Sequence, residues 1–135
     1  MKTILKTVLI IFISVLNLNC KTEPSNSATQ RGKVILVSPA DFKEKSQNQT
    51  IIDIRTPQEY GQGYIEGAIN INYFDRSFLD QVSEFDKNKP IFIYCRSGNR
   101  TSSASKKLLK LGFTEVYDLQ GGIISWARDK NEIVK

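Results

Sequence analysis

Ile91-Phe-Ile-Tyr-Cys95-Arg-Ser-Gly-Asn-Arg100-Thr101 is the stretch that decides the fold of this 135-residue chain. Residues 90–94 form a short apolar run that begins with a proline, which is typical of a buried strand. Residues 101–111 then repeat apolar side chains at helical spacing, and Gly112 ends that pattern. The sequence therefore predicts a strand, a tight loop and a helix, with Cys95 at the point where the strand ends.

The predicted position of Cys95 favours chemistry at its thiol. The first N–H groups of a helix lack partners and lie at the positive end of the helix dipole, so they attract an anion. Arg96 and Arg100 flank the same position, and Gly98 lets the loop curl because glycine adopts backbone angles that other residues avoid. We therefore expect the loop amides and the arginines to stabilise the thiolate of Cys95, which is the reactive form.

The flanking sequence repeats the alternation of strand and helix. Short apolar runs predict strands at residues 34–37, 50–54, 68–71 and 116–118. Helices are predicted at residues 77–85 and 123–128, and also after two capping residues that precede a proline, Ser38 and Thr56.

This alternation predicts an α/β fold with a mostly parallel central sheet flanked by helices. In such sheets the carboxyl ends of the strands share one edge, and ligands bind there. Asp53 and Cys95 each follow an apolar run, so both are expected at that edge.

The composition excludes several kinds of chemistry. The chain contains no histidine, which removes Ser-His-Asp and Cys-His catalysis and histidine-bearing zinc sites. Its two cysteines lie far apart in the sequence, so no metal site is expected. The net charge of +5 comes without a long basic run, so we expect no nucleic-acid binding.

The N-terminus is typical of an export signal. Two lysines precede residues 8–16, an apolar run too short to span a bilayer comfortably. Cys20 and a polar stretch follow, an order similar to that of a bacterial lipoprotein signal, in which the cysteine is lipidated; residues 17–19 depart from the usual pattern. We predict a signal peptide at residues 1–19, a lipid-anchor cysteine and flexible linker at residues 20–32, and one domain at residues 33–135.

The expected location is outside the cytoplasm, as a membrane-anchored lipoprotein facing the periplasm or the cell exterior. Two alternatives are a cleaved secretory signal in which Cys20 is incidental, and an uncleaved membrane anchor. All three place the domain in an oxidising compartment, where structural cysteines normally pair. An unpaired Cys95 would be exposed to oxidation there, which argues against a role in packing alone.

Four motifs occur in order along the predicted domain. They are Asp53-Ile-Arg55-Thr-Pro-Gln-Glu59-Tyr60, Gly63-Tyr64-Ile-Glu66-Gly-Ala-Ile-Asn70-Ile71, Cys95-Arg-Ser-Gly-Asn-Arg100-Thr101, and a C-terminal motif of Leu111-Gly-Phe113, Val116 and Leu119-Gln-Gly-Gly122-Ile-Ile-Ser-Trp126. Together they resemble a single-domain rhodanese, of the thiosulfate sulfurtransferase family. Tyr64 and Glu66 stand where the family usually has His and Pro, and we expect these changes to alter local packing and leave the chemistry in place.

The resemblance implies a rhodanese-like domain that moves sulfane sulfur from thiosulfate, or a similar anionic donor, to a thiophilic acceptor such as cyanide, a thiol or a protein. Cys95 is the implied catalytic residue and carries the sulfur as a persulfide. The residues expected to bind the donor are Arg96, Ser97, Gly98, Asn99, Arg100 and Thr101. No metal or organic cofactor is required.

Two further residues, Asp53 and Arg55, are expected to support the site. A strand-end aspartate such as Asp53 commonly caps a turn or pairs with a nearby arginine. Arg55 and Glu59 are interpreted as a local ion pair or as scaffold.

Three other interpretations stay open at this point. Related phosphatases and arsenate reductases place five residues between Cys and Arg, whereas four separate Cys95 from Arg100. Cys95 could instead be a buried structural cysteine. The domain could also be a rhodanese-like sulfur carrier or binding module with little or no turnover. The intact loop, with its glycine and two arginines, favours sulfur transfer over these alternatives.

Overall fold

The computed structural model describes residues 32–135. The predicted signal peptide, Cys20 and all but the last residue of the predicted linker lie outside this part of the chain. The elements follow in the order β1 (Lys33–Val37), α1 (Pro39–Lys45), β2 (Thr50–Asp53), α2 (Pro57–Gly61), β3 (Ala68–Asn70), α3 (Phe78–Ser83), β4 (Ile91–Tyr94), α4 (Asn99–Lys110), β5 (Glu115–Leu119) and α5 (Gly122–Arg128).

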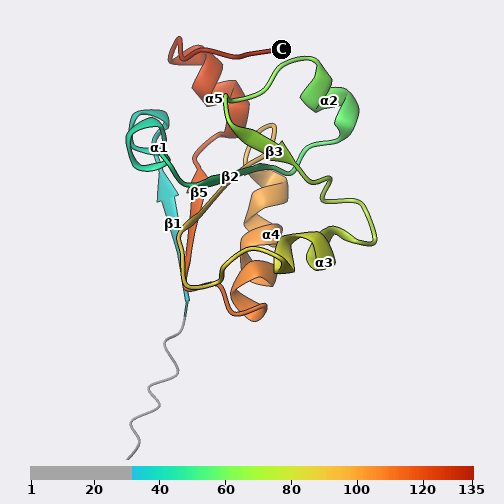
Figure 1. Cartoon of the computed structure of the whole chain (residues 1–135). Coiled ribbons are helices and arrows are strands. Elements are labelled where there is room, and N and C mark those ends of the chain that lie inside the picture. The colour runs from blue at the N-terminus through green and yellow to red at the C-terminus, as the bar shows by residue number, and fades with distance from the viewer. Residues whose placement is uncertain (1–31) are drawn as a thin grey trace, which may run out of the picture.

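The five strands form one sheet in the order β1-β5-β4-β2-β3, and every neighbouring pair is parallel (Figure 1). The expected α/β fold with a parallel central sheet is therefore confirmed. Because the strands are parallel, their carboxyl ends meet at one edge, and Cys95 lies there directly after the central strand β4. The chain enters β1 at the opposite edge, where the Lys33 N–H donates to the Thr114 carbonyl at 3.0 Å.

Helices cover both faces of the sheet. On one face, α3 and α4 bury Phe78, Val82, Ala104 and Leu108 against the strands. On the other face, Phe42 of α1 and Trp126 of α5 pack against each other with their rings edge to face. The side chains of β4 alternate between these two cores, which explains why residues 91–94 are apolar without interruption.

The two predicted helix caps are confirmed. Ser38 Oγ accepts the Asp41 N–H at 3.2 Å, and Thr56 forms the complete capping box with Glu59. One boundary differs from expectation, because α4 begins at Asn99 and not at Thr101. Gly98 has a φ of +98°, a left-handed conformation that turns the chain into the helix two residues sooner.

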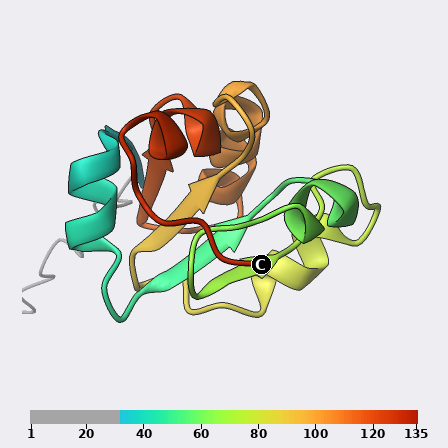
Figure 2. The same ribbon diagram turned by 90° about the horizontal axis from the view of Figure 1, so that it is seen from above.

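The C-terminal segment closes over the loop that follows α2 (Figure 2). Tyr64 and Val134 exchange backbone hydrogen bonds of 2.9 Å in both directions. The Tyr64 ring stacks on Tyr60 with 4.1 Å between centroids, and Glu66 is exposed. Tyr64 therefore contributes to local packing through its ring and its backbone.

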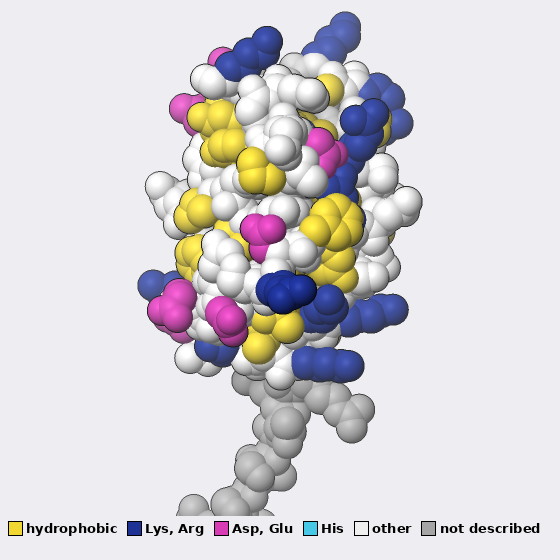
Figure 3. All heavy atoms as spheres, turned by 90° about the vertical axis from the view of Figure 1, so that its right-hand side faces the viewer, with side chains coloured by type: hydrophobic (Ala, Val, Ile, Leu, Met, Phe, Trp, Pro, Cys, Tyr) yellow, Lys and Arg dark blue, Asp and Glu magenta, His cyan; other side chains and the backbone are white. Residues whose placement is uncertain are grey.

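The surface carries mixed charge. On the side shown in Figure 3, basic, acidic and apolar side chains lie among one another. Phe74, in the loop between β3 and α3, is 66% exposed. Within residues 32–135, no helix has the length and apolar character that crossing a membrane requires.

Candidate active site

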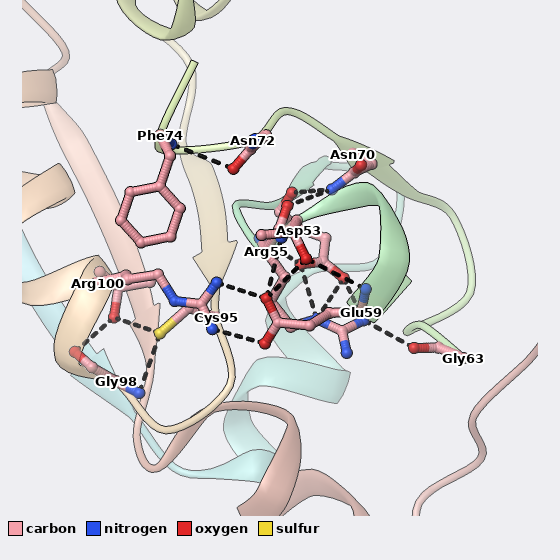
Figure 4. A network of polar contacts seen from close by, with 12 residues as sticks. Asp53, Arg55, Glu59, Gly63, Asn70, Asn72, Phe74, Cys95, Gly98 and Arg100 are labelled. Carbon is pink, nitrogen blue, oxygen red and sulfur yellow. Dashed lines mark hydrogen bonds and ion pairs between the residues drawn. The ribbon is translucent and has the colours of Figure 1, made fainter. Parts of the chain in front are cut away.

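Cys95 lies at the base of a short loop between β4 and α4, which we call the thiol loop (residues 95–99). Its sulfur accepts the Gly98 N–H at 3.1 Å, and the Thr101 hydroxyl lies 3.9 Å from it (Figure 4). We expected the amides of residues 96–101 to surround the sulfur, but that of Gly98 alone, among the described residues, hydrogen-bonds to it. The left-handed Gly98 aims its N–H back at Cys95, and α4 starts immediately afterwards.

The thiol loop is bonded to the start of α5. The amides of Ile123 and Ile124 donate to the carbonyl oxygens of Cys95 and Arg96 at 3.0 and 3.2 Å. These amides belong to the first turn of the helix, so they have no partner inside it and are free to hold another segment. Gly122 lies so close to the loop that a Cβ atom there would stand 2.5 Å from the Cys95 carbonyl oxygen. The backbone of Cys95 is therefore fixed from outside its own strand and helix.

Arg100 does not point freely into solvent. Its guanidinium donates two hydrogen bonds of 2.7 Å to Glu59, at the end of the first turn of α2, and lies 5.7 Å from the centre of the Phe74 ring. These bonds from Arg100 lower the pKa of Glu59 to about 2. The predicted local pair of Arg55 and Glu59 is thus wrong, because Glu59 reaches across to the thiol loop instead.

Arg55 pairs with Asp53. The Arg55 Nε donates to both carboxylate oxygens at 3.0 and 2.9 Å, and Asp53 also accepts the Arg55 backbone N–H at 2.9 Å. Both residues are buried, and Arg55 Nη2 donates to the Gly63 carbonyl at 2.7 Å. Asn70 bonds to the backbone carbonyls of Asp53 and Arg55, which fixes the chain after β2. Asp53 and Arg55 therefore form a buried ion pair at the edge of the sheet, and their support of the site stays a prediction.

Arg96 is the remaining arginine of the thiol loop. It is exposed and makes no side-chain hydrogen bond or ion pair with another described residue. It lines a cavity of about 230 Å³, here called the Arg96 cleft, together with Arg55, Ile123 and Ile133. Ser97 and Asn99 are also exposed, whereas Thr101 is buried and donates its hydroxyl hydrogen to the Gly98 carbonyl at 2.9 Å.

Asp118 is a buried carboxyl group that the sequence did not single out. It lies on β5, is 4% exposed, and its Oδ1 is the buried side-chain oxygen without a hydrogen-bond partner among the described residues. Burial raises its pKa to about 6, and the nearby Thr101 hydroxyl, which is bonded to Gly98, offsets that rise only in part. No pattern in the sequence around a strand aspartate shows whether its carboxylate will find a hydrogen-bond donor in the fold.

The described residues form no metal-binding cluster. Residues 32–135 contain no group of three or more Cys, Asp or Glu side chains that could hold a metal ion. The cysteine described by the structure is Cys95, which is free and 1% exposed.

Fold and site define a class of protein: a parallel α/β domain with a cysteine at the carboxyl end of its central strand, under a glycine loop and a helix N-terminus. The family model of the rhodanese-like domain matches residues 38–129. The chain belongs to the rhodanese-like family.

Named relatives agree with this assignment. The chain is 41% identical over 88 residues to a protein named thiosulfate sulfurtransferase 16, chloroplastic, from Arabidopsis thaliana, a match that covers 58% of this chain and 73% of the relative. It is 38% identical over 89 residues to a protein named sulfurtransferase from Allochromatium vinosum, covering 66% and 81% of the two chains. A crystal structure of a rhodanese-related protein from Thermoplasma volcanium superimposes with a TM-score of 0.67 at 29% identity, covering 74% of this chain and 97% of that one. These names support sulfurtransferase activity in general.

The contact between α5 and the thiol loop can be tested with two glycine variants. Gly122 (φ +60°) and Gly67 (φ +79°) share a left-handed backbone, but a Cβ meets the thiol loop at Gly122 and no atom within 4 Å at Gly67. Both alanine variants lose about 1–2 kcal/mol through backbone strain, and Gly122→Ala is expected to lose about 1 kcal/mol or more in addition. Urea unfolding measures both losses. Equal losses would show that α5 does not fix the loop.

The buried Asp118 predicts a dependence of stability on pH. Its pKa is 3.8 in an unfolded chain and about 6 in the fold, so between these values the folded state binds more protons. Folding stability therefore falls as pH rises from about 4 to 6, by on the order of 2 kcal/mol. Asp118→Asn removes this dependence. The unfolding free energy of the variant, measured relative to that of wild type, should therefore rise as pH increases from about 4 to 6. A difference that is constant from pH 4 to 7 would contradict it.

Proposed function

We propose that the chain is an exported sulfurtransferase that moves sulfane sulfur from thiosulfate, or a similar anionic donor, to a thiophilic acceptor through a persulfide on Cys95. The observation that supports it best is the contact of the Gly98 N–H with the Cys95 sulfur at the start of α4. A donor aimed at that sulfur, together with the helix terminus, favours the negatively charged form that must attack.

The first half-reaction follows from this arrangement. The Cys95 thiolate attacks the outer sulfur of thiosulfate and forms a new S–S bond. The bond between the two sulfur atoms of thiosulfate breaks, and sulfite leaves with its electron pair. The outer sulfur now carries the negative charge and occupies the mouth of the thiol loop. In the second half-reaction, cyanide attacks that sulfur, the persulfide bond breaks, and thiocyanate and the Cys95 thiolate form.

The arginines have different roles in this proposal. Arg96 is exposed at the Arg96 cleft and has no partner in the described part of the chain, so it attracts the dianionic donor. Arg100 is held by Glu59, so its charge is fixed beside the loop and is largely neutralised by its partner. A fixed Arg100 also argues against phosphatase chemistry, in which the arginine must be available to a tetrahedral oxyanion.

A second candidate is a sulfur carrier that turns over thiosulfate poorly. Two observations favour it: Cys95 is 1% exposed, and Arg100 is bonded to Glu59. A buried thiol with one free arginine limits reaction with small donors in solution, and a protein that docks at the thiol loop would then supply or remove the sulfur.

Mass spectrometry and a cyanide assay discriminate the two candidates. The purified protein is incubated with thiosulfate; sulfurtransferase activity predicts a +32 Da adduct on Cys95 and continuous thiocyanate formation with cyanide. Cys95→Ser is expected to lose both signals. A single adduct without thiocyanate formation would favour the carrier, and full activity in Cys95→Ser would rule out the persulfide mechanism.

We further propose that residues 1–19 are an export signal and that Cys20 carries a lipid which anchors the protein to a membrane. The support is the order of charged, apolar and polar segments around Cys20. The intact mass of the protein extracted from cell membranes tests it: the expected species begins at Cys20 with added lipid mass, and Cys20→Ala is expected to remain unlipidated. A species without lipid mass on Cys20 would contradict the anchor.

A further inference from the structure

A second cavity lies behind the thiol loop, between the edge strand β1 and α4. We call it the β1–α4 pocket. Its volume is about 470 Å³, within the range of roughly 300–1,000 Å³ that is usual for sites of small ligands. Val34 and Leu36 of β1 form its apolar wall, Ser102 and Ser105 of α4 line the other side, and Asp118 of β5 lies between them. The β1–α4 pocket shares no lining residue with the Arg96 cleft.

The pocket exists because α4 does not cover the edge of the sheet. Leu36 is directly opposite Asp118 in the strand register, and Val34 is opposite Val116. Val116 is fully buried by α4, whereas Val34 and Leu36 are 41% and 60% exposed. The β1–α4 pocket is therefore apolar on the side of β1, where Val34 and Leu36 are in contact with solvent.

Asp118 contributes a carboxylate to the lining of this pocket. Its Oδ1 is buried and receives no hydrogen bond from the described residues. An unpaired carboxylate oxygen in such a position is costly, and a charged donor would offset that cost. Lys106 lines the pocket and is exposed, but it forms no ion pair with Asp118. Because the pKa of Asp118 lies near 6, the group is mainly ionised at neutral pH.

We propose that the β1–α4 pocket binds a small organic cation, with an ammonium or guanidinium group at the Asp118 carboxylate and an apolar body against Val34 and Leu36. A charge-assisted hydrogen bond to a carboxylate is among the stronger polar contacts in proteins. The carboxylate repels anions, so the occupant differs in chemistry from a sulfur donor such as thiosulfate. The proposal concerns binding alone, and the occupant would lie beside Ser97, Gly98 and Asn99 of the thiol loop.

Gly98 connects the pocket to the thiol. It lines the β1–α4 pocket, its N–H donates to the Cys95 sulfur, and its carbonyl accepts the Thr101 hydroxyl. An occupant therefore contacts the residue that bonds to the sulfur, and the amide of Gly98 is a natural reporter of binding.

NMR titration of the ¹⁵N-labelled full chain tests the proposal. The probe is n-butylammonium, and n-pentanol is a neutral molecule of similar shape. Butylammonium is expected to shift the amide signals of Gly98, Ser102, Asp118 and Gln120 to saturation, and n-pentanol is expected to bind at least about tenfold more weakly. The peptide acetyl-Gly-Lys-Gly-amide presents the same cation on a peptide chain and is expected to bind more weakly than butylammonium. Tighter binding of the peptide would contradict a small-molecule occupant and would indicate that the pocket receives a lysine side chain of a partner protein.

Three variants complete the test. Asp118→Asn is expected to weaken butylammonium binding at least about tenfold, whereas Glu115→Gln, which removes a half-buried carboxylate paired with Lys33 on the same strand, is expected to leave it unchanged. Leu36→Lys places a positive charge at the exposed mouth of the pocket and is expected to abolish binding even if Asp118→Asn fails to fold. Equal binding by wild type and by Leu36→Lys or a folded Asp118→Asn would overturn the proposal, as would equal binding of n-pentanol or shifts that do not saturate.

Discussion

Two hydrogen bonds between the start of α5 and the thiol loop hold the site together. The Ile123 and Ile124 amides would be unpaired at a helix N-terminus, and the carbonyls of Cys95 and Arg96 would be unpaired at a strand end. The hydrogen bonds between these amides and carbonyls satisfy both kinds of group and join α5 to the end of β4. The close approach requires that position 122 carry no side chain, so a glycine in the last motif determines how the loop is held.

Charge pairing around the loop leaves one arginine available. Arg55 is buried with Asp53, and Arg100 is engaged by Glu59, so each of these cations already has a carboxylate partner. Paired charges at partly buried positions keep their geometry better than free ones, because each partner fixes the other. Arg96 differs because it is exposed and has no ion-pair partner within residues 32–135. The buried sulfur adds a second restriction, since an incoming molecule must reach it past the loop.

The sequence was sufficient for the architecture and for the position of Cys95 at the end of the central strand. Apolar runs of strand length, helix caps at Ser38 and Thr56, and a glycine after the cysteine are local signals, and the structure places all of them as expected. The partner of Glu59 could not be predicted, because Arg55 and Arg100 are both plausible partners until the fold sets their distances. The early start of α4 depends on the backbone angle of Gly98, and the unpaired oxygen of Asp118 depends on which groups surround it; neither is a property of the local sequence.

The parallel sheet also gives the domain a polarity. Gly32 lies against the Phe113 carbonyl at the amino edge of the sheet, where a side chain would not fit, and Cys95 lies at the carboxyl edge. The point at which the chain enters the sheet and the free cysteine thus lie at opposite ends of the strands. If the segment before residue 32 attaches the protein to a surface, the length of the sheet separates the attachment point from the thiol.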